Sequence, residues 1–328
     1  MDENIRKLLR RQGNIQGGAM LIYSGVMYMC VFLVLTVALL MLALSELFAG
    51  GTDLQMQAYS FDAYLQQAMQ IGNWGYLLAV VTCFLILLLW KKPAYLRQVV
   101  LAPGRAMGRL DFLQLCAVFL SGQQIFSWWY LLMDAVASGV GISLDALLES
   151  ATVDTKDLPM FLYACLLGPV AEELLFRGLV LRSLEGYGKR FAIVVSALLF
   201  ALIHGNLLQL PFAFLTGLVL GYVALEHHFG WAVLLHMLNN LVMADLLPRL
   251  LSLLPQGAGD GILTAFILLC AVAAAVILLL RRRDIQDYWR SHGSEKGTYA
   301  AFFRAPAMVI YLIISVLSLL ALPLLALV

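Results

Sequence analysis

The chain has 328 residues, of which 62% are hydrophobic and only 12% are charged. Soluble domains usually carry about twice that charged fraction, so the composition indicates a membrane protein and excludes an ordinary soluble domain. The formal net charge is +1. Because this charge gives no strongly positive surface potential, we expect no nucleic-acid partner.

Apolar runs long enough to cross a bilayer follow one another along the chain, since a hydrocarbon core needs about 20 apolar residues per helix. The candidate spans are 21–48, 74–90, 110–134, 159–181, 191–207, 209–226, 230–247, 261–280 and 306–327. The fifth, sixth and seventh runs are separated by very short connections, so their borders are soft. The sequence therefore predicts an all-α fold, a polytopic transmembrane helical bundle with eight or nine spans, whose first partner is the lipid bilayer.

The first apolar run is too long for a cleavable signal peptide and lacks a small-residue cleavage site, so we expect a retained first span. Lysine and arginine then set the orientation. With nine spans, 18 of the 21 basic residues fall on the N-terminal side, in the N-terminal segment and three loops, 91–109, 182–190 and 281–304. Because cytoplasmic loops collect basic residues, we expect the N-terminus in the cytoplasm and the C-terminus outside.

Ionisable residues interrupt the fourth apolar run at "GPVAEELLFRG", residues 168–178. Such residues are rare in membranes and face the bundle interior or a water cavity. On a helix, Glu173 and Arg177 share a face and can pair, whereas Glu172 is rotated about 100° from Glu173. We expect Arg177 to neutralise Glu173 and Glu172 to act as a general base. Pro169 predicts a bend that lines a polar cavity.

Two histidines and an amide follow on later apolar helices. "FALIH" ends at His204, and "HMLNN" places His236 and Asn240 four residues apart on one helix face. A water held by Glu172 and one histidine could attack a carbonyl, while the other histidine and Asn240 stabilise the oxyanion. The purely structural alternative is that the Glu173–Arg177 pair is a lock and that the histidines only bond one helix to the next.

The same residues could also bind a metal. Two histidines and a carboxylate form a common hydrolytic zinc shell, and its ligands would be Glu172, His204 and His236. Zinc is therefore a possible cofactor. We expect no tightly bound metal, because the base and the oxyanion donors are complete without one.

Other polar and small residues receive simpler interpretations. We expect His227 and His228 to be interfacial at a helix end and His292 to be solvated in a polar loop. Gly217 and Gly221 form a GxxxG step, which predicts close helix packing and not a binding site.

The motifs "EELLFR", "FALIH" and "HMLNN", in this order on successive apolar helices, resemble those of the CAAX protease and bacteriocin-processing (CPBP) family. The family is also called the abortive-infection proteins. Its members are intramembrane glutamate-dependent endopeptidases, often classed as metalloproteases. The resemblance covers about residues 159–247 and departs from the family pattern at none of the motif positions.

The resemblance assigns a role to each motif residue. It implies that Glu172 activates water with His204, and that His236 and Asn240 hold the oxyanion. Glu173 and Arg177 take the remaining, supporting positions of the first motif. It also divides the chain into three parts: residues 1–158 with the N-terminal basic segment and three accessory transmembrane helices, 159–247 as the catalytic core, and 248–328 with two transmembrane helices and a cytoplasmic basic loop.

The expected function is hydrolysis of peptide bonds in membrane-associated or cytoplasmic-side peptides and proteins by a Glu/His-activated water. The alternative is an inactive membrane scaffold or a proton-coupled transporter that uses the same buried cluster. The compact chain and the lack of an organelle signal favour a multi-pass protein of a bacterial cell membrane. A prenylated substrate then requires a prenylation system in the same cell.

Overall fold

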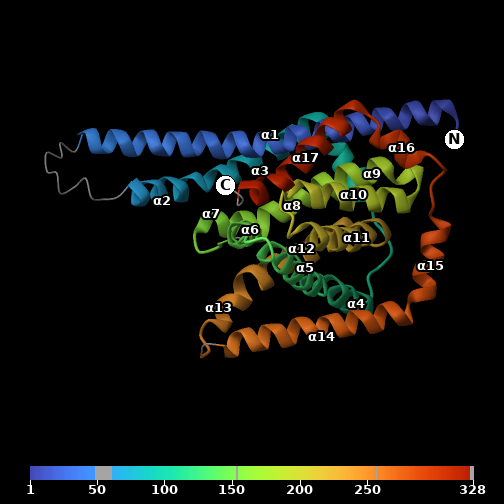
Figure 1. Cartoon of the computed structure of the whole chain (residues 1–328). Coiled ribbons are helices and arrows are strands. Elements are labelled where there is room, and N and C mark those ends of the chain that lie inside the picture. Colours follow the sequence, from blue (N-terminus) through green and yellow to red (C-terminus); the bar gives the residue numbers. More distant parts are fainter. Residues whose placement is uncertain (49–60, 153, 256, 326–328) are drawn as a thin grey trace.

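The computed structural model describes residues 1–48, 61–152, 154–255 and 257–325, and the regular structure in these ranges is helical throughout. Figure 1 shows the long helix α1 (Glu3–Phe48) along one edge and α14 (Ala258–Leu280) along the opposite edge, with shorter helices stacked between them. The predicted all-α class is confirmed for the described residues.

The other elements follow in chain order, and the η segments are π-helical except η5, which is a 3-10 turn. They are α2 (Phe61–Gly72), α3 (Trp74–Tyr95), η2 (Leu96–Val100), α4 (Arg109–Leu120), α5 (Gly122–Ser138), α6 (Asp145–Ala151), α7 (Leu158–Phe161), η3 (Leu162–Leu167), α8 (Gly168–Glu173), η4 (Leu174–Leu181), α9 (Arg182–Leu184), η5 (Glu185–Tyr187), α10 (Lys189–Ile203), α11 (Leu210–Glu226), α12 (Phe229–Asn239), η6 (Asn240–Leu246), α13 (Leu247–Leu251), α15 (Arg282–Ser291), α16 (Thr298–Phe303) and α17 (Pro306–Leu325).

Within the described ranges, five helical segments are long and apolar enough to cross a membrane: Glu3–Ser45, Ala63–Val100, Arg109–Ser138, Phe229–Leu251 and Ala258–Leu280. Two shorter apolar helices are Leu210–Glu226 and Pro306–Ala321. Eight or nine spans are therefore not confirmed. The predicted span 159–181, which contains the acidic cluster and its arginine, is not among the five. The predicted span 191–207 falls short because α10 has only 15 residues, about 22 Å of helix.

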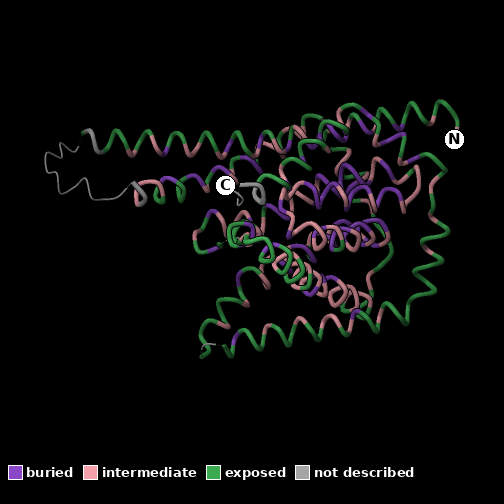
Figure 2. Tube along the Cα trace, viewed as in Figure 1, coloured by how far each residue is buried: buried purple, intermediate pink, exposed green. Residues whose placement is uncertain are grey.

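Large apolar side chains are exposed on the outer helices. Figure 2 shows that most of α14 and the outer half of α1 are exposed, while α10 and α11 are largely buried. Phe32 on α1 is 71% exposed and Leu269 on α14 is 68% exposed. Continuous apolar surface of this kind is not left to water in a stable protein. The chain is a multi-pass membrane protein whose outer helices face lipid.

The core of the bundle lies where α10 packs against α11. Gly217 and Gly221 allow this contact, since a Cβ on Gly217 would lie 3.0 Å from the Cα of Ala197, and one on Gly221 would lie 3.3 Å from the Ile193 side chain. Close helix packing, as predicted for this GxxxG step, is confirmed.

The first helix is fixed to the rest of the bundle by glycines of its own. A Cβ on Gly13 or Gly17 would overlap the backbone of Phe302 or Met308, so α16 and α17 approach the backbone of α1 directly. On another side, a Cβ on Gly75 of α3 would overlap the backbone of α1. The N-terminal and C-terminal helices therefore form one packed unit (Figure 1).

The basic segments that predicted the orientation lie together at the end of the bundle that carries the N-terminus (Figure 1). Glu226, at the end of α11, accepts hydrogen bonds from the Nζ of Lys189 at 2.7 Å and from the hydroxyl of Tyr288 at 2.8 Å. Burial and this bond to a carboxylate raise the pKa of the Tyr288 hydroxyl. His292, expected in solvent, stacks on Tyr288 with ring centroids 4.2 Å apart.

The paired histidines after α11 hold a loop at the same end. His227 is only 1% exposed, and its Nδ1 lies 3.3 Å from the carbonyl oxygen of Arg105. The Nε2 of His228 lies 3.3 Å from the carbonyl oxygen of Leu101. These rings therefore contact the chain between η2 and α4, and the burial of His227 departs from the expected interfacial position.

Candidate active site

The acidic cluster lies on one continuous helical segment, residues 158–184, built from α7, η3, α8, η4 and α9. Asp157 caps its start, because its carboxylate accepts a hydrogen bond from the backbone N–H of Met160 at 2.9 Å. In the π-helical turn, Gly168 donates its N–H to the carbonyl of Tyr163, and a Cβ on Gly168 would lie 2.6 Å from that oxygen. Pro169 follows and has no N–H to donate. The helix is thus irregular just before Glu172.

Glu173 and Arg177 form a fully buried ion pair. Both side chains are 0% exposed, and Nη1 of Arg177 donates to Oε1 of Glu173 at 2.9 Å. Nη2 of Arg177 donates to the carbonyl oxygen of Gly217 at 3.2 Å. The guanidinium carbon lies 4.4 Å from the ring centroid of Phe200, within cation–π range. The predicted contact between Glu173 and Arg177 is confirmed.

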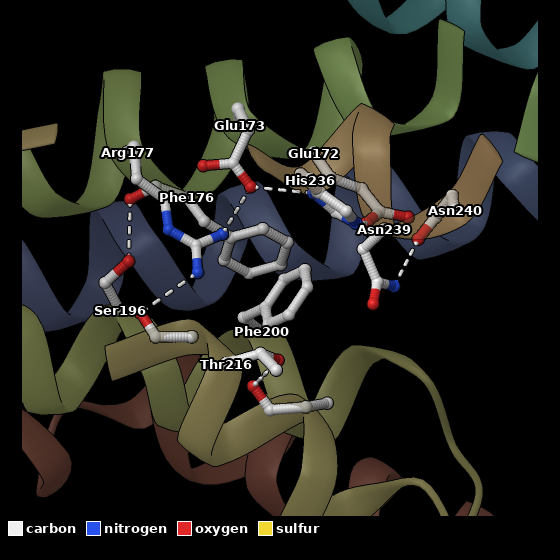
Figure 3. Close-up of polar contacts among 12 residues, drawn as sticks. Glu172, Glu173, Phe176, Arg177, Ser196, Phe200, Thr216, His236, Asn239 and Asn240 are labelled. Atoms are coloured by element: carbon white, nitrogen blue, oxygen red, sulfur yellow. Dashed lines mark hydrogen bonds and ion pairs between the residues drawn. The ribbon is translucent and has the colours of Figure 1, made fainter. Parts of the chain in front are cut away.

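The same carboxylate oxygen also holds His236. Figure 3 shows Oε1 of Glu173 between Arg177 and His236, and the distance from this oxygen to Nδ1 of His236 is 2.9 Å. A nitrogen that faces a carboxylate carries its hydrogen, so Nδ1 is the donor and Nε2 is the nitrogen left for other contacts. This contact joins residues 63 positions apart and has no signal in the sequence.

Glu172 lies beside this network without being part of it. Its Oε2 is 3.8 Å from Nε2 of His236, and its side chain is 17% exposed. Among the described residues, no group donates a hydrogen bond to its carboxylate. The two neighbouring glutamates therefore have different environments. Glu173 is buried and contacts Arg177 and His236. Glu172 accepts no hydrogen bond from a described residue and faces the imidazole of His236.

Phe200 brings the second histidine to the cluster. Its ring centroid is 4.9 Å from that of His204 and 5.6 Å from that of His236, and both contacts are edge-on. Nδ1 of His204 lies 2.7 Å from the carbonyl oxygen of Phe200. Because a carbonyl only accepts, Nδ1 is the donor, and Nε2 of neutral His204 can accept a proton. Both imidazoles therefore pack on one phenyl ring, and a shared water between His204 and Glu172 stays a prediction.

Asn240 replaces a hydrogen bond that Pro169 cannot make. Its Nδ2 donates to the carbonyl oxygen of Ala164 at 2.8 Å. In the π-helical pattern of the preceding residue, the N–H at position 169 would point to this same carbonyl. Oδ1 of Asn240 accepts from Nδ2 of Asn239 at 3.0 Å (Figure 3). The amide is held at both ends and keeps one N–H free, as an oxyanion donor requires.

Residues 154–242 match the family described as Type II CAAX prenyl endopeptidase Rce1-like. The match confirms the resemblance to the CAAX protease family over this segment, and every predicted site residue lies inside it. The matched family is, by its description, a family of endopeptidases. No curated protein and no solved structure matches the chain.

A polar cluster that the motifs did not indicate ties the start of the Rce1-like segment to η6 and α13, near its end. Asp245 accepts hydrogen bonds from Oγ1 of Thr155 at 2.6 Å and from Nε of Arg249 at 2.8 Å. The spacing of Asp245 and Arg249 by four residues is a recognisable helix-pair signal. The cluster fixes η6, and therefore Asn240, against the start of the segment.

The structure gives the Rce1-like segment no ready metal shell. Within the part of the chain that the structure describes, no three His, Cys, Asp or Glu side chains are gathered closely enough to hold a metal ion. Glu172, His204 and His236, the ligands a zinc ion would use, therefore do not fit a metal in this arrangement.

A chelator should leave turnover unchanged. The predicted base, the two imidazoles and the predicted amide donor form a complete set for hydrolysis without metal chemistry. The measurement is peptide cleavage by purified protein before and after dialysis against a strong chelator, with zinc content determined by elemental analysis. Stoichiometric zinc whose removal stops cleavage, and whose return restores it, would contradict this expectation.

Changing Pro169 to alanine should lower kcat by about tenfold, because a small misplacement of the Asn240 amide, the predicted oxyanion donor, is costly. The new N–H would compete with Asn240 for the carbonyl of Ala164 and loosen the amide. The free energy of unfolding should change by about 1 kcal/mol or less. Pro159, at the start of α7, offers a matched control, since Pro159→Ala replaces another proline of the same helical segment. Equal activity of Pro169→Ala and Pro159→Ala would contradict the role given to Pro169.

Proposed function

We propose that the protein is an intramembrane endopeptidase that hydrolyses peptide bonds with a water activated by Glu172 and His204. One observation supports this most strongly, the different environments of two adjacent glutamates. Oε1 of the fully buried Glu173 contacts both Arg177 and His236, whereas Glu172 has no donor among the described residues and faces His236 at 3.8 Å. A carboxylate in that position is available to take a proton.

The proposed reaction follows from the free atoms of the site. Glu172 takes a proton from the water, which His204 orients through its free Nε2, and the hydroxide adds to the carbonyl carbon of the scissile bond. The oxyanion accepts a hydrogen bond from the remaining N–H of Asn240. The proton then passes from Glu172 to the leaving nitrogen, the C–N bond breaks, and a carboxylic acid and an amine are released.

In this scheme His236 is a second oxyanion donor, and it donates through a hydrogen on Nε2. That requires the doubly protonated ring, because Nδ1 already donates to Glu173. The Glu173 carboxylate compensates this charge and fixes the plane of the ring, and Arg177 in turn fixes Glu173. The pair therefore acts as a support for His236 and not as a proton carrier.

We place the basic end of the bundle in the cytoplasm of a bacterial cell, with the N-terminus on that side. The support is that the loops rich in lysine and arginine share one end of the structure (Figure 1). Substrates are then peptides or proteins in the membrane or at its cytoplasmic face. The matched family is described as a CAAX prenyl endopeptidase family, so a prenyl group is one arm of the test.

The deciding experiment uses purified protein in liposomes and two quenched fluorogenic peptides. Both end in cysteine, two aliphatic residues and any residue, and only one carries a farnesyl group. Cleavage of either peptide supports the endopeptidase, and the preference between them defines the prenyl requirement. A wider peptide library covers other sequences. No cleavage of any peptide, together with proton-coupled uptake into the liposomes, would overturn the proposal in favour of a transporter.

A further inference from the structure

The Asn240 side chain belongs to a chain of hydrogen-bonded amides that begins on another helix. Its backbone N–H donates to the carbonyl oxygen of His236, so the two residues are one helical turn apart. Oδ1 of Asn240 accepts from Nδ2 of Asn239 at 3.0 Å (Figure 3), and Oδ1 of Asn239 accepts from Nε2 of Gln123 at 3.2 Å. Gln123 lies on α5, which is outside the Rce1-like segment, residues 154–242.

The carbonyl oxygen of Ala164 fixes the direction of every hydrogen bond in this chain. A carbonyl only accepts, so the end of the Asn240 amide that lies 2.8 Å from it is the NH2 group. Oδ1 of Asn240 then faces Asn239, whose Nδ2 supplies the donor. In that orientation Oδ1 of Asn239 faces Gln123, whose Nε2 supplies the next donor. The orientation of each amide therefore depends on the one before it.

Asn239 cannot take its orientation from bulk water, because it is only 7% exposed. A buried amide oxygen without a donor is costly, and among the described residues Gln123 is the one that donates to Oδ1 of Asn239. Thr216, on α11, donates its hydroxyl to the carbonyl oxygen of Phe212 at 2.8 Å. Without Gln123, the Asn239 oxygen has no donor, and the amide can turn so that its oxygen faces Oδ1 of Asn240.

The packing of α5 on α11 fixes the position of Gln123. A Cβ on the preceding residue, Gly122, would lie 3.0 Å from both the Phe212 ring and the Cγ2 of Thr216. The same helix α11 carries Gly217, whose carbonyl oxygen accepts from Nη2 of Arg177 at 3.2 Å. The helix against which Gln123 is held therefore also supports the buried ion pair of the site.

We propose that Gln123 is a positioning residue of the active site, whose amide orients Asn239 and, through it, the oxyanion donor Asn240. With this chain complete, one N–H of Asn240 is bonded to Ala164 and the other stays free for the oxyanion. The inference rests on the proposed function, in which Asn240 binds the oxyanion. A helix outside the matched segment thus sets the orientation of a motif residue.

Two replacements of Gln123 separate a donor role from packing, and kcat is measured with a peptide that the wild type cleaves. Gln123→Met keeps the length and removes the donor. It should lower kcat by about three- to tenfold and change KM by less than about twofold. Gln123→Glu, when ionised, can only accept, so it favours the reversed orientation of Asn239 and then of Asn240. At neutral pH it should lower kcat by about 30- to 100-fold.

The pH profile is the readout that a purely structural role would not change. Once protonated, the carboxyl in Gln123→Glu donates its O–H to Asn239, as the Gln123 amide does. The kcat of Gln123→Glu relative to wild type should therefore rise as the pH falls and exceed the relative kcat of Gln123→Met. Gln124→Glu is the matched control, because Gln124 is also 7% exposed and is rotated about 100° from Gln123 on the same helix. Its kcat relative to wild type should not depend on pH.

Thermal unfolding tests the chain of amides without turnover. Gln123→Met and Asn239→Leu each remove one partner of the same hydrogen bond. Once one change has been made, the other should lower the unfolding midpoint by less than it does alone. The combination of Gln124→Met with Asn239→Leu is the control, and its two shifts should add.

Four results would overturn the role of Gln123: unchanged kcat in both variants, Gln123→Glu no worse than Gln123→Met at neutral pH, an equal rise of kcat at low pH in Gln124→Glu, or additive midpoint shifts for Gln123→Met and Asn239→Leu. The proposed function fails separately. Full activity of Glu172→Gln or of Asn240→Leu would remove the base or the oxyanion donor, and neither result alters the unfolding test.

Discussion

Glu172→Gln should lower peptide hydrolysis by about 10³-fold, the range expected for loss of a general base. Glutamine has nearly the same shape but cannot take a proton from water. Because no described group donates a hydrogen bond to Glu172, and its closest charged contact is His236 at 3.8 Å, the substitution breaks no strong interaction. The free energy of unfolding should therefore stay within about 1 kcal/mol of the wild-type value.

The measurement is kcat for the cleaved fluorogenic peptide, alongside thermal unfolding in the same detergent. Glu185→Gln is a matched control, since Glu185 lies 13 positions along the chain and pairs with Arg182 at 3.0 Å near the helix end. It should keep wild-type turnover. Cleavage by Glu172→Gln at more than about a tenth of the wild-type rate would show that the base is another residue.

The local part of the site could be predicted from the sequence. Glu173 and Arg177 are four positions apart, so helical geometry alone brings them to one face, and it directs Glu172 elsewhere. The contact of His236 with Glu173 joins residues 63 positions apart and depends on how α12 packs against α8. Nothing in either motif specifies this register, which explains why the most informative contact of the site was not foreseen.

For Pro169 and Asn240, too, the local feature could be predicted from the sequence and the long-range contact could not. The proline indicated an irregular helix, because a missing N–H always leaves a carbonyl without its partner. The sequence does not indicate which group donates to that carbonyl, because Asn240 and Ala164 are 76 positions apart.

The span predictions are not confirmed where hydropathy was the only guide. Residues 3–20 are helical and continuous with the first apolar run, because the basic segment is rich in good helix formers and packs on α16. The predicted span 191–207 ends early because the helix stops at Ile203 and Gly205 adopts a positive φ of 60°. The three-part division of the chain stays a prediction, although the Rce1-like match lies almost entirely within residues 159–247.

Glu173→Gln should lower the free energy of unfolding by about 3–5 kcal/mol, the cost of removing one partner from a buried ion pair. Arg177 is 0% exposed and would keep its charge without a carboxylate to compensate it. His236 would also lose the charged acceptor that fixes Nδ1. The same substitution should therefore reduce kcat, but through a misplaced imidazole and not through loss of the base.

The double variant Glu173→Gln/Arg177→Met separates these two effects. Removing both charges should recover much of the lost stability, because a buried pair can be replaced by neutral groups far more cheaply than it can be broken. Turnover should stay low in the double variant, since His236 still lacks its carboxylate. Thermal or denaturant unfolding in detergent gives the first quantity, and peptide cleavage gives the second. If Glu172→Gln and Glu173→Gln lower stability equally, the two glutamates do not have the separate roles that their contacts imply.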